Sequence, residues 1–264
     1  MEDITSKRRK LVIMRHAERV DFTFGNWMEP AFDEHGNYIR FNLNMPVSVP
    51  KRNPMDFQRD CPLTRIGTFQ ATITGESMKE HGLSFSHVFC SPSLRCIQTC
   101  SDVLKASNQS HLPINIEPAL FEWCGWYKDI FPEFLGLEDM KANDYNVALD
   151  YKPVVSVDDL RLGINETSEE FYMRSFLTTK TLLDTYDGDL LFVGHAATLD
   201  TCSRQLIGKM PRNNDEVQRL MHHIMYAAVA IVEKDSENVW ELVDPPFPAL
   251  KHTSNASFNW KVFL

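Results

Sequence analysis

The chain has 264 residues, of which 43% are hydrophobic and 24% are charged, a composition typical of a folded globular protein. Its formal net charge of -9 argues against a nucleic-acid binder, because such proteins usually carry a basic face. The sequence contains no secretory signal and no apolar run long enough to span a membrane. Its six cysteines form no CxxC pair, so we expect reduced thiols and a cytoplasmic location.

Short apolar strands alternate with amphipathic helices along the chain. In chain order, the expected elements are a strand at 10–16, a helix at 63–82, a strand at 87–92, a helix at 91–107, a strand from 114, short helical pieces at 132–163, a helix at 168–188, a strand at 189–195, a helix at 196–208 and two closing strands at 226–234 and 238–243. This alternation predicts an α/β fold with a mostly parallel central sheet and helices on both faces.

Two stretches do not follow the alternation. Residues 20–60 lack periodicity, and a segment of this length is typical of a functional insertion or lid. The tail, residues 244–264, is rich in proline at its start and in aromatic residues at its end, and we expect it to pack back onto the domain.

Charged and polar side chains follow four of the predicted strands. Because ligands bind at the carboxyl ends of the strands in this architecture, we expect these side chains to meet at one edge of the sheet. They are Arg15, His16, Arg19, Arg95, Glu122 and His195. Taken alone, Arg15-His16 and Arg19 could form a solvated basic turn, but four strand ends that supply such side chains favour one site.

These residue types suit phosphoryl transfer from an ester. Arginine offers a planar, permanently charged fork to phosphate, and helix N-termini after Pro92 and His195 could add N–H donors. A neutral imidazole can attack phosphorus and form a phosphohistidine, which divides hydrolysis into two steps. Glu122 could protonate the leaving oxygen and then activate water. No set of metal ligands is visible, since the adjacent His222 and His223 would not face one site on a helix, and no cofactor is expected.

The motifs RHAER, SPSLRCIQT, LFEW and VGHA together resemble the histidine phosphatase superfamily, formerly grouped around phosphoglycerate mutase, and DCPLTRIGTFQA resembles another of its conserved blocks. The resemblance runs from Lys10 to the C-terminus. It implies a phosphoglycerate mutase-like fold for a single domain, residues 1–264, with a long active-site insertion at about 20–60. EPALFEW, VDDL and TCSRQLIG are most similar to the phosphatase domain of suppressor of T-cell receptor signalling proteins and to ecdysteroid-phosphate phosphatases.

The resemblance implies a role for each residue. His16 matches the phosphorylated nucleophile, His195 the second pocket histidine and Glu122 the proton donor. The arginines at positions 15, 19 and 95 match the phosphate-binding residues. Ala17 departs from the family, which usually has glycine there; if that position needs a positive φ, the methyl group lowers activity.

The resemblance also bears on the partners. It implies a metal-independent phosphomonoesterase acting on a phosphotyrosine protein or a small lipophilic phosphate ester such as a steroid phosphate, with no nucleic-acid or membrane partner. A homodimer is possible because the resembling branch dimerises. Proteins of that branch carry other domains before this one, and the initial Met favours a stand-alone enzyme over an excised domain.

Two alternatives remain open. A mutase would have to retain its product for return transfer, and nothing in RHAERVD favours that. A catalytically weak phosphate-binding module is kept open by Ala17. Several aromatic residues could line the pocket or belong to the core: Phe22, Phe24, Trp27, Trp123, Trp126 and Tyr127.

Overall fold

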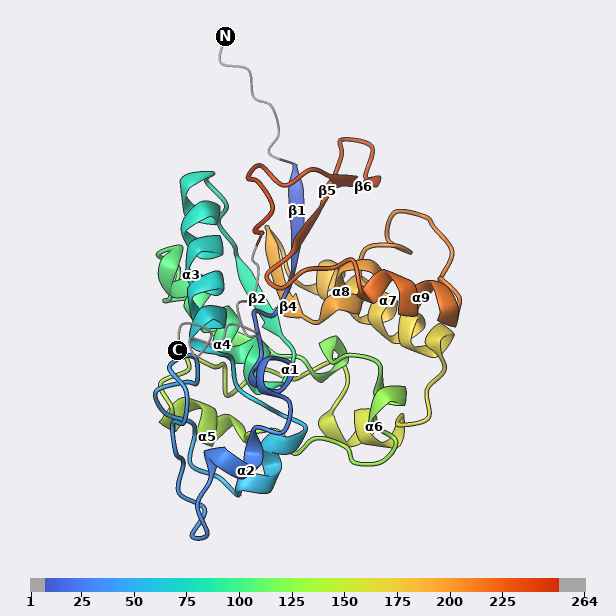
Figure 1. Ribbon diagram of the computed structural model, residues 1–264. Coiled ribbons are helices and arrows are strands. Elements are labelled where there is room, and N and C mark those ends of the chain that lie inside the picture. Colours follow the sequence, from blue (N-terminus) through green and yellow to red (C-terminus); the bar gives the residue numbers. More distant parts are fainter. Residues whose placement is uncertain (1–7, 252–264) are drawn as a thin grey trace, which may run out of the picture.

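A six-stranded sheet forms the centre of the molecule in the computed structural model, which describes residues 8–251 (Figure 1). The strand order is β3-β2-β4-β1-β5-β6. The strands are β1 (Arg9–Arg15), β2 (His87–Cys90), β3 (Ile114–Ile116), β4 (Leu190–Gly194), β5 (Val229–Lys234) and β6 (Trp240–Val243).

The strands β1 to β4 pair in parallel, and β5 and β6 add an antiparallel edge next to β1. The predicted mostly parallel sheet of an α/β fold is therefore confirmed. Because β1, β2 and β4 are neighbours and run in one direction, the residues that follow them emerge at the same edge of the sheet.

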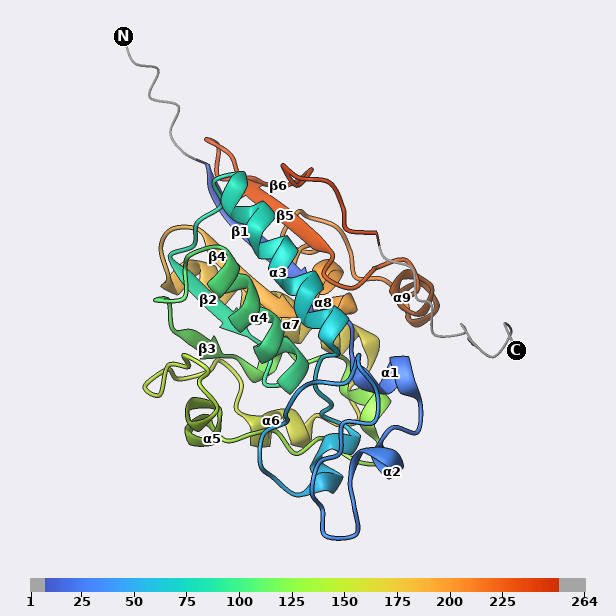
Figure 2. The same cartoon turned by 60° about the vertical axis from the view of Figure 1, so that its left-hand side comes forward.

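Helices cover both faces of the sheet. Figures 1 and 2 show α3 and α4 on one face, and α7 and α8 on the other with α9 beside them. The covering helices are α3 (Arg65–Glu80), α4 (Leu94–Ala106), α7 (Ser168–Thr185), α8 (Ala196–Thr201) and α9 (Asn214–Met221). Shorter helices lie beyond the carboxyl ends of the parallel strands or connect to them: α1 (Val20–Phe24), α2 (Met28–Ala31), η1 (Pro54–Gln58), η2 (Pro118–Leu120), η3 (Cys124–Tyr127), α5 (Leu137–Ala142) and α6 (Val157–Leu162).

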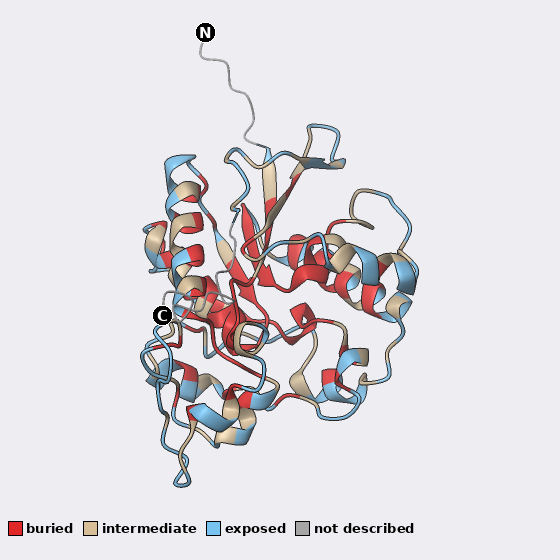
Figure 3. Cartoon of the chain, viewed as in Figure 1, coloured by how far each residue is buried: buried red, intermediate tan, exposed pale blue. Residues whose placement is uncertain are grey.

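The alternation of side chains along each strand divides the core into two clusters, because successive residues of a strand point to opposite faces. In β1, Val12 and Met14 join the cluster that contains residues of α3 and α4. Leu11 and Ile13 join the cluster that contains residues of α7 and α8. The buried residues accordingly gather on the strands and on the inner faces of the helices (Figure 3). This packing holds the end of β1 rigidly from both sides.

The structure departs from the sequence prediction in two helices. The helix expected at 196–208 ends at Thr201 and gives way to turns, because Ser203 donates its hydroxyl to the carbonyl of Leu199 and competes with the helical backbone bonds. Helix α9 was not predicted, although Asn213 and Glu216 form a capping box at its start.

The two irregular stretches are partly ordered by packing. Residues 20–60 contain α1, α2 and η1, and Trp27 and Phe57 from this stretch are buried in the core. In the tail, Phe247 and Leu250 pack against the core, whereas the expected packing of residues 252–264 lies outside the described residues.

Candidate active site

The six predicted site residues lie together at the carboxyl edge of β1, β2 and β4. His16 follows β1, Arg95 lies in the first turn of α4, and His195 is the N-cap of α8. A pocket of about 440 Å³ opens above them and is lined by Arg15, His16, Arg19 and Glu122 among others. Arg95 and His195, which are 0% and 1% exposed, complete the cluster from below through contacts with Glu122.

His16 is fixed in one tautomer. Its Nδ1 lies 2.8 Å from the carbonyl oxygen of Ala17, and since a carbonyl can only accept, Nδ1 carries the proton. The lone pair therefore resides on Nε2. Burial, together with the charges of Arg95 and Arg15, holds the pKa of His16 well below its ordinary value. His16 is therefore a neutral imidazole with a free nitrogen beside the pocket.

His195 lies next to His16, with 5.4 Å between the ring centroids. Its Nδ1 accepts a hydrogen bond from Nη2 of Arg95 at 3.2 Å, so Nε2 carries the proton and donates it to Oγ of Ser91 at 2.8 Å. Burial lowers the pKa of His195 well below its ordinary value, against the opposing effect of Glu122. Ser91 was not among the predicted site residues, although it ends the second predicted strand.

Glu122 takes up the positive charge of the pocket. Arg95 and the hydroxyl of Tyr127 both donate hydrogen bonds to its Oε1, and Nη1 of Arg19 lies 4.0 Å away. Burial alone would raise the pKa of Glu122, but the positive charges of Arg95 and Arg19 and the hydrogen bond from Tyr127 hold it below its ordinary value. Glu122 is therefore ionised and acts as the counter-anion of the arginines.

The arginines retain unpaired N–H donors that can bind an anion other than Glu122. Among the described residues, Nε and Nη1 of Arg95 and Nε of Arg15 are buried without a hydrogen-bond partner. Unpaired buried donors are rare in proteins because each costs free energy. Guanidinium groups in this state are suited to a phosphate group, which offers several acceptor oxygens.

Arg15 and Arg19 are each held in place by a residue that the sequence reasoning did not select. The guanidinium of Arg15 lies 4.3 Å from the ring centre of Tyr226 and donates to the carbonyl of Ile224. The guanidinium of Arg19 forms a two-pronged pair with Asp21, with Nε 2.6 Å from Oδ1. Asp21 follows RHAER by only two residues, so a search for a partner carboxylate could have found it.

Ala17 does not adopt a positive φ. Its side chain is fully buried in the core, and its N–H donates to Oγ1 of Thr99 at 3.0 Å. The methyl group therefore sits in a conformation that any residue can adopt, and the backbone beside His16 is tied directly to α4.

The outer part of the pocket is lined by side chains from loops and short helices. Phe22, which is 72% exposed, lies with its ring 4.5 Å from the guanidinium carbon of Arg19. Trp126 and Tyr127 also line the pocket, whereas the indole of Trp123 donates to the carbonyl of Glu166 and is not part of the lining. The remaining outer lining residues are Gln58, Arg59, Gln218, Met221 and His222. His222, interpreted from sequence as a surface or packing residue, is exposed and also lies at the pocket.

Asp60 accepts a backbone N–H at the start of α4. Oδ1 of Asp60 accepts the N–H of Leu94 at 2.7 Å, and Oδ2 lies 3.0 Å from Nη1 of Arg52. Asp60 therefore occupies one of the N–H groups that this helix terminus was expected to offer to phosphate, that of Leu94. Asp60 and Arg52 also connect residues 20–60 to the helix that carries Arg95.

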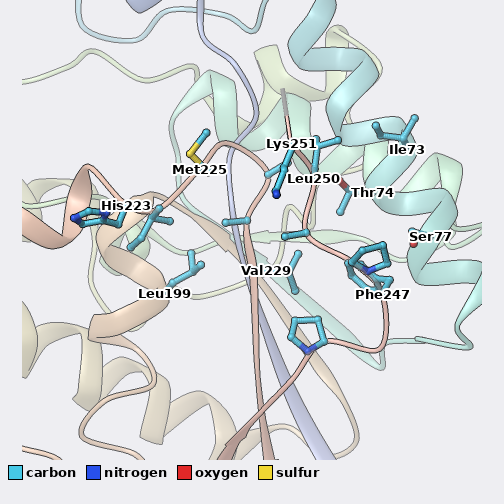
Figure 4. Close-up of a pocket in the computed structure, with 16 residues that line it drawn as sticks. Ile73, Thr74, Ser77, Leu199, His223, Met225, Val229, Phe247, Leu250 and Lys251 are labelled. Carbon is cyan, nitrogen blue, oxygen red and sulfur yellow. The ribbon is translucent and has the colours of Figure 1, made fainter. Parts of the chain in front are cut away.

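A larger cavity, of about 570 Å³, lies between α3, the start of β5 and residues 245–251 (Figure 4). Its lining is mainly apolar and includes Leu199, Val229 and Phe247. None of the six predicted site residues lines it. Size alone would therefore point to the wrong place, and the clustered charge identifies the smaller pocket as the candidate active site.

Residues 8–251 hold neither a cluster of metal ligands nor a membrane-spanning helix. No group of three or more His, Cys, Asp or Glu residues in this range is placed to hold a metal ion. No helix in the same range is long and apolar enough to cross a membrane.

Comparison with known proteins identifies relatives of the chain. Residues 48–244 match the family description "Histidine phosphatase superfamily (branch 1)"; this match includes Arg95, Glu122 and His195 but not His16. An ecdysteroid-phosphate phosphatase of Drosophila melanogaster is 43% identical over 97% of this chain and 34% of its own length. Ubiquitin-associated and SH3 domain-containing protein B of Mus musculus is 37% identical over 98% of this chain and 42% of its own length.

One solved structure is similar over its whole length. The crystal structure of the ecdysone phosphate phosphatase from Bombyx mori, in complex with tungstate, superposes with a TM-score of 0.85 at 31% identity and covers 97% of this chain and 100% of that one. This similarity confirms the predicted fold. The chain spans between a third and a half of the length of the curated relatives it matches.

Proposed function

Because this chain belongs to the histidine phosphatase superfamily, we propose that it is a phosphomonoester hydrolase that works through a phosphohistidine at His16 and needs no metal ion. One observation carries the proposal. A neutral His16, with its lone pair on Nε2, lines a pocket together with Arg15 and Arg19, and the fully buried Arg95 lies next to it with two unpaired N–H donors.

The first step transfers the phosphoryl group to His16. Nε2 attacks phosphorus, the bond from phosphorus to the ester oxygen breaks, and the leaving oxygen takes a proton from Glu122. Glu122 is ionised before substrate binds, so it must first gain a proton. A bound phosphate dianion should raise the pKa of Glu122, because it competes for Arg95 and Arg19, the cations that keep this pKa low.

The second step releases phosphate. Glu122, now a carboxylate again, takes a proton from a water molecule, whose oxygen attacks phosphorus as the bond to Nε2 breaks. The three arginines stabilise the charge on the equatorial oxygens in both steps, and His195 holds Arg95 in place by accepting its hydrogen bond at Nδ1.

The outer pocket supports a lipophilic leaving group. Phe22, Trp126 and Met221 present apolar surface directly beside the phosphate subsite. We propose a steroid phosphate or a similar ring system, in line with the two ecdysteroid-phosphate phosphatases among the relatives. Phosphotyrosine is the second candidate, because Phe22 and Trp126 can also contact a single aromatic ring. A panel of ecdysteroid phosphates and phosphotyrosine peptides, ranked by kcat/KM, decides between them.

The proposed chemistry is tested with p-nitrophenyl phosphate in the presence of EDTA. The wild-type protein should release p-nitrophenol, and His16→Ala should lower kcat by ~10⁴-fold or more, as removal of a catalytic nucleophile does elsewhere. Acid quenching during turnover should trap phosphate on the wild type and not on the variant. A wild type that binds tungstate without turnover would make the chain a phosphate-binding module, and a requirement for added metal would refute the mechanism.

A further inference from the structure

The loop that carries Glu122 has few regular backbone bonds to hold it. Residues 121–123 lie between the short helices η2 and η3, and the loop must nevertheless place a carboxylate next to Arg95 and Arg19. Misplacement of a catalytic group by about 1 Å can cost two orders of magnitude in rate. The structure should therefore contain a separate device that fixes this loop.

Arg174, in the second turn of α7, contacts the loop at three carbonyl oxygens. Its Nη1 donates to the carbonyls of Ala119 at 2.7 Å and Phe121 at 3.1 Å, and its Nη2 donates to the carbonyl of Glu122 itself at 3.3 Å. A guanidinium is the only side chain with enough fixed donors to serve three such acceptors at once.

Glu166 completes the device. Its carboxylate receives Nε and Nη2 of Arg174 at 3.0 and 2.6 Å, and Oε1 also accepts the N–H of Cys124 at 2.9 Å. The carbonyl of Glu166 accepts the indole N–H of Trp123 at 2.8 Å. The side chains of both ion-pair partners are only 11% and 8% exposed, so water screens the pair weakly.

We propose that the Arg174–Glu166 pair positions Glu122 for proton transfer: Arg174 binds the residues before and at position 122, and Glu166 binds those just after it. This inference rests on the proposed function, in which Glu122 protonates the leaving group. Neither residue of the pair lines the pocket, so both act through Glu122 and are positioning residues.

The test compares substrates that need the proton with one that needs it less. Phenolate, with a pKa of about 10 like tyrosine, leaves poorly without protonation, whereas p-nitrophenolate leaves readily. Arg174→Lys keeps the charge and loses the fork, so kcat/KM for phenyl phosphate should fall by about tenfold and for p-nitrophenyl phosphate by less than about threefold. In a Glu122→Gln background, Arg174→Lys should leave the ratio of the two substrates unchanged.

Arg161→Lys is the matched control. Arg161 forms an ion pair with Glu133 on the surface, at 3.1 Å, and its replacement should change kcat/KM for neither substrate. Equal losses for both substrates in Arg174→Lys, or a changed ratio in the Glu122→Gln background, would overturn the proposal.

Glu166→Gln is a second, milder test of the same ion pair. This variant should change the ratio of kcat/KM for the two substrates in the same direction as Arg174→Lys. Circular dichroism checks that each variant folds. If both variants fail to fold, the pair is a support of the fold and the proposal is wrong. A wild type that hydrolyses neither substrate refutes the proposed function itself, before any variant is measured.

Discussion

The inner and outer parts of the pocket are built in different ways. The inner part consists of buried residues that directly follow strands or begin helices, such as His16, Arg95 and His195. The outer part consists of exposed side chains on loops and short helices, such as Phe22 and Trp126. The difference indicates that phosphate chemistry is fixed by the core of the fold, whereas selection of the leaving group depends on segments that can change without disturbing the core.

Among substitutions that leave the nucleophile His16 in place, loss of an inner arginine should have the largest effect. Arg95→Ala removes two unpaired donors that we propose bind phosphate and leaves the charge of Glu122 without its nearest partner, so kcat/KM should fall by ~100-fold or more for every ester, as for loss of one preorganised donor. Steady-state kinetics with an aryl and an alkyl phosphate measure this. A loss below threefold would remove Arg95 from the site.

Loss of an outer aromatic residue should act only on selected substrates. Phe22→Ala and Trp126→Ala each remove apolar contact with a bulky leaving group, so KM for a steroid phosphate should rise by about tenfold while a small alkyl phosphate is unaffected. If KM rises equally for both substrates, the distinction between the inner and outer parts of the pocket is wrong.

The protonation state of His16 depends on the inner part of the pocket and not on the outer part. Since burial and the charges of Arg95 and Arg15 lower its pKa, His16 should stay neutral as the pH falls below 6.5, and the ability to attack phosphorus should persist there. An NMR titration of the ring nitrogens, assigned with His16→Asn, measures this directly. Arg95→Ala should raise the pKa toward the ordinary value. A midpoint of 6.5 or above in the wild type would contradict the buried, cation-surrounded state.

The smallest effect is expected at Ala17. Because its φ is not positive, Ala17→Gly should change kcat/KM by less than about threefold and should slightly lower the melting temperature through added chain entropy. A large gain in activity would show that the methyl group restrains the phosphate pocket.

The inner part could be predicted from sequence because one rule covers it. Residues that follow parallel strands meet at one edge, so Arg15, His16 and His195 were brought together by the strand pattern alone. The fold followed for the same reason, since its strands are short, apolar and separated by helices.

The outer part and its supports could not be predicted in the same way. Trp123 and Trp126 look equivalent in sequence, and only the position of the Glu166 carbonyl decides which of them turns away from the pocket. Arg174 resembles any charged residue of an amphipathic helix, because its three carbonyl acceptors lie more than 50 residues earlier in the chain. Tertiary contacts of this kind leave no local pattern.

The cap that Asp60 forms on α4 has a consequence for exchanging specificity between relatives. Residues 20–60 form a continuous segment that could be exchanged between relatives to change the preference for a leaving group. Their last residue, however, secures the helix that presents Arg95, and it is held in turn by Arg52. A chimera should therefore keep the recipient's Arg52, Asp60 and start of α4 together. Otherwise the exchange will alter phosphate binding along with substrate choice.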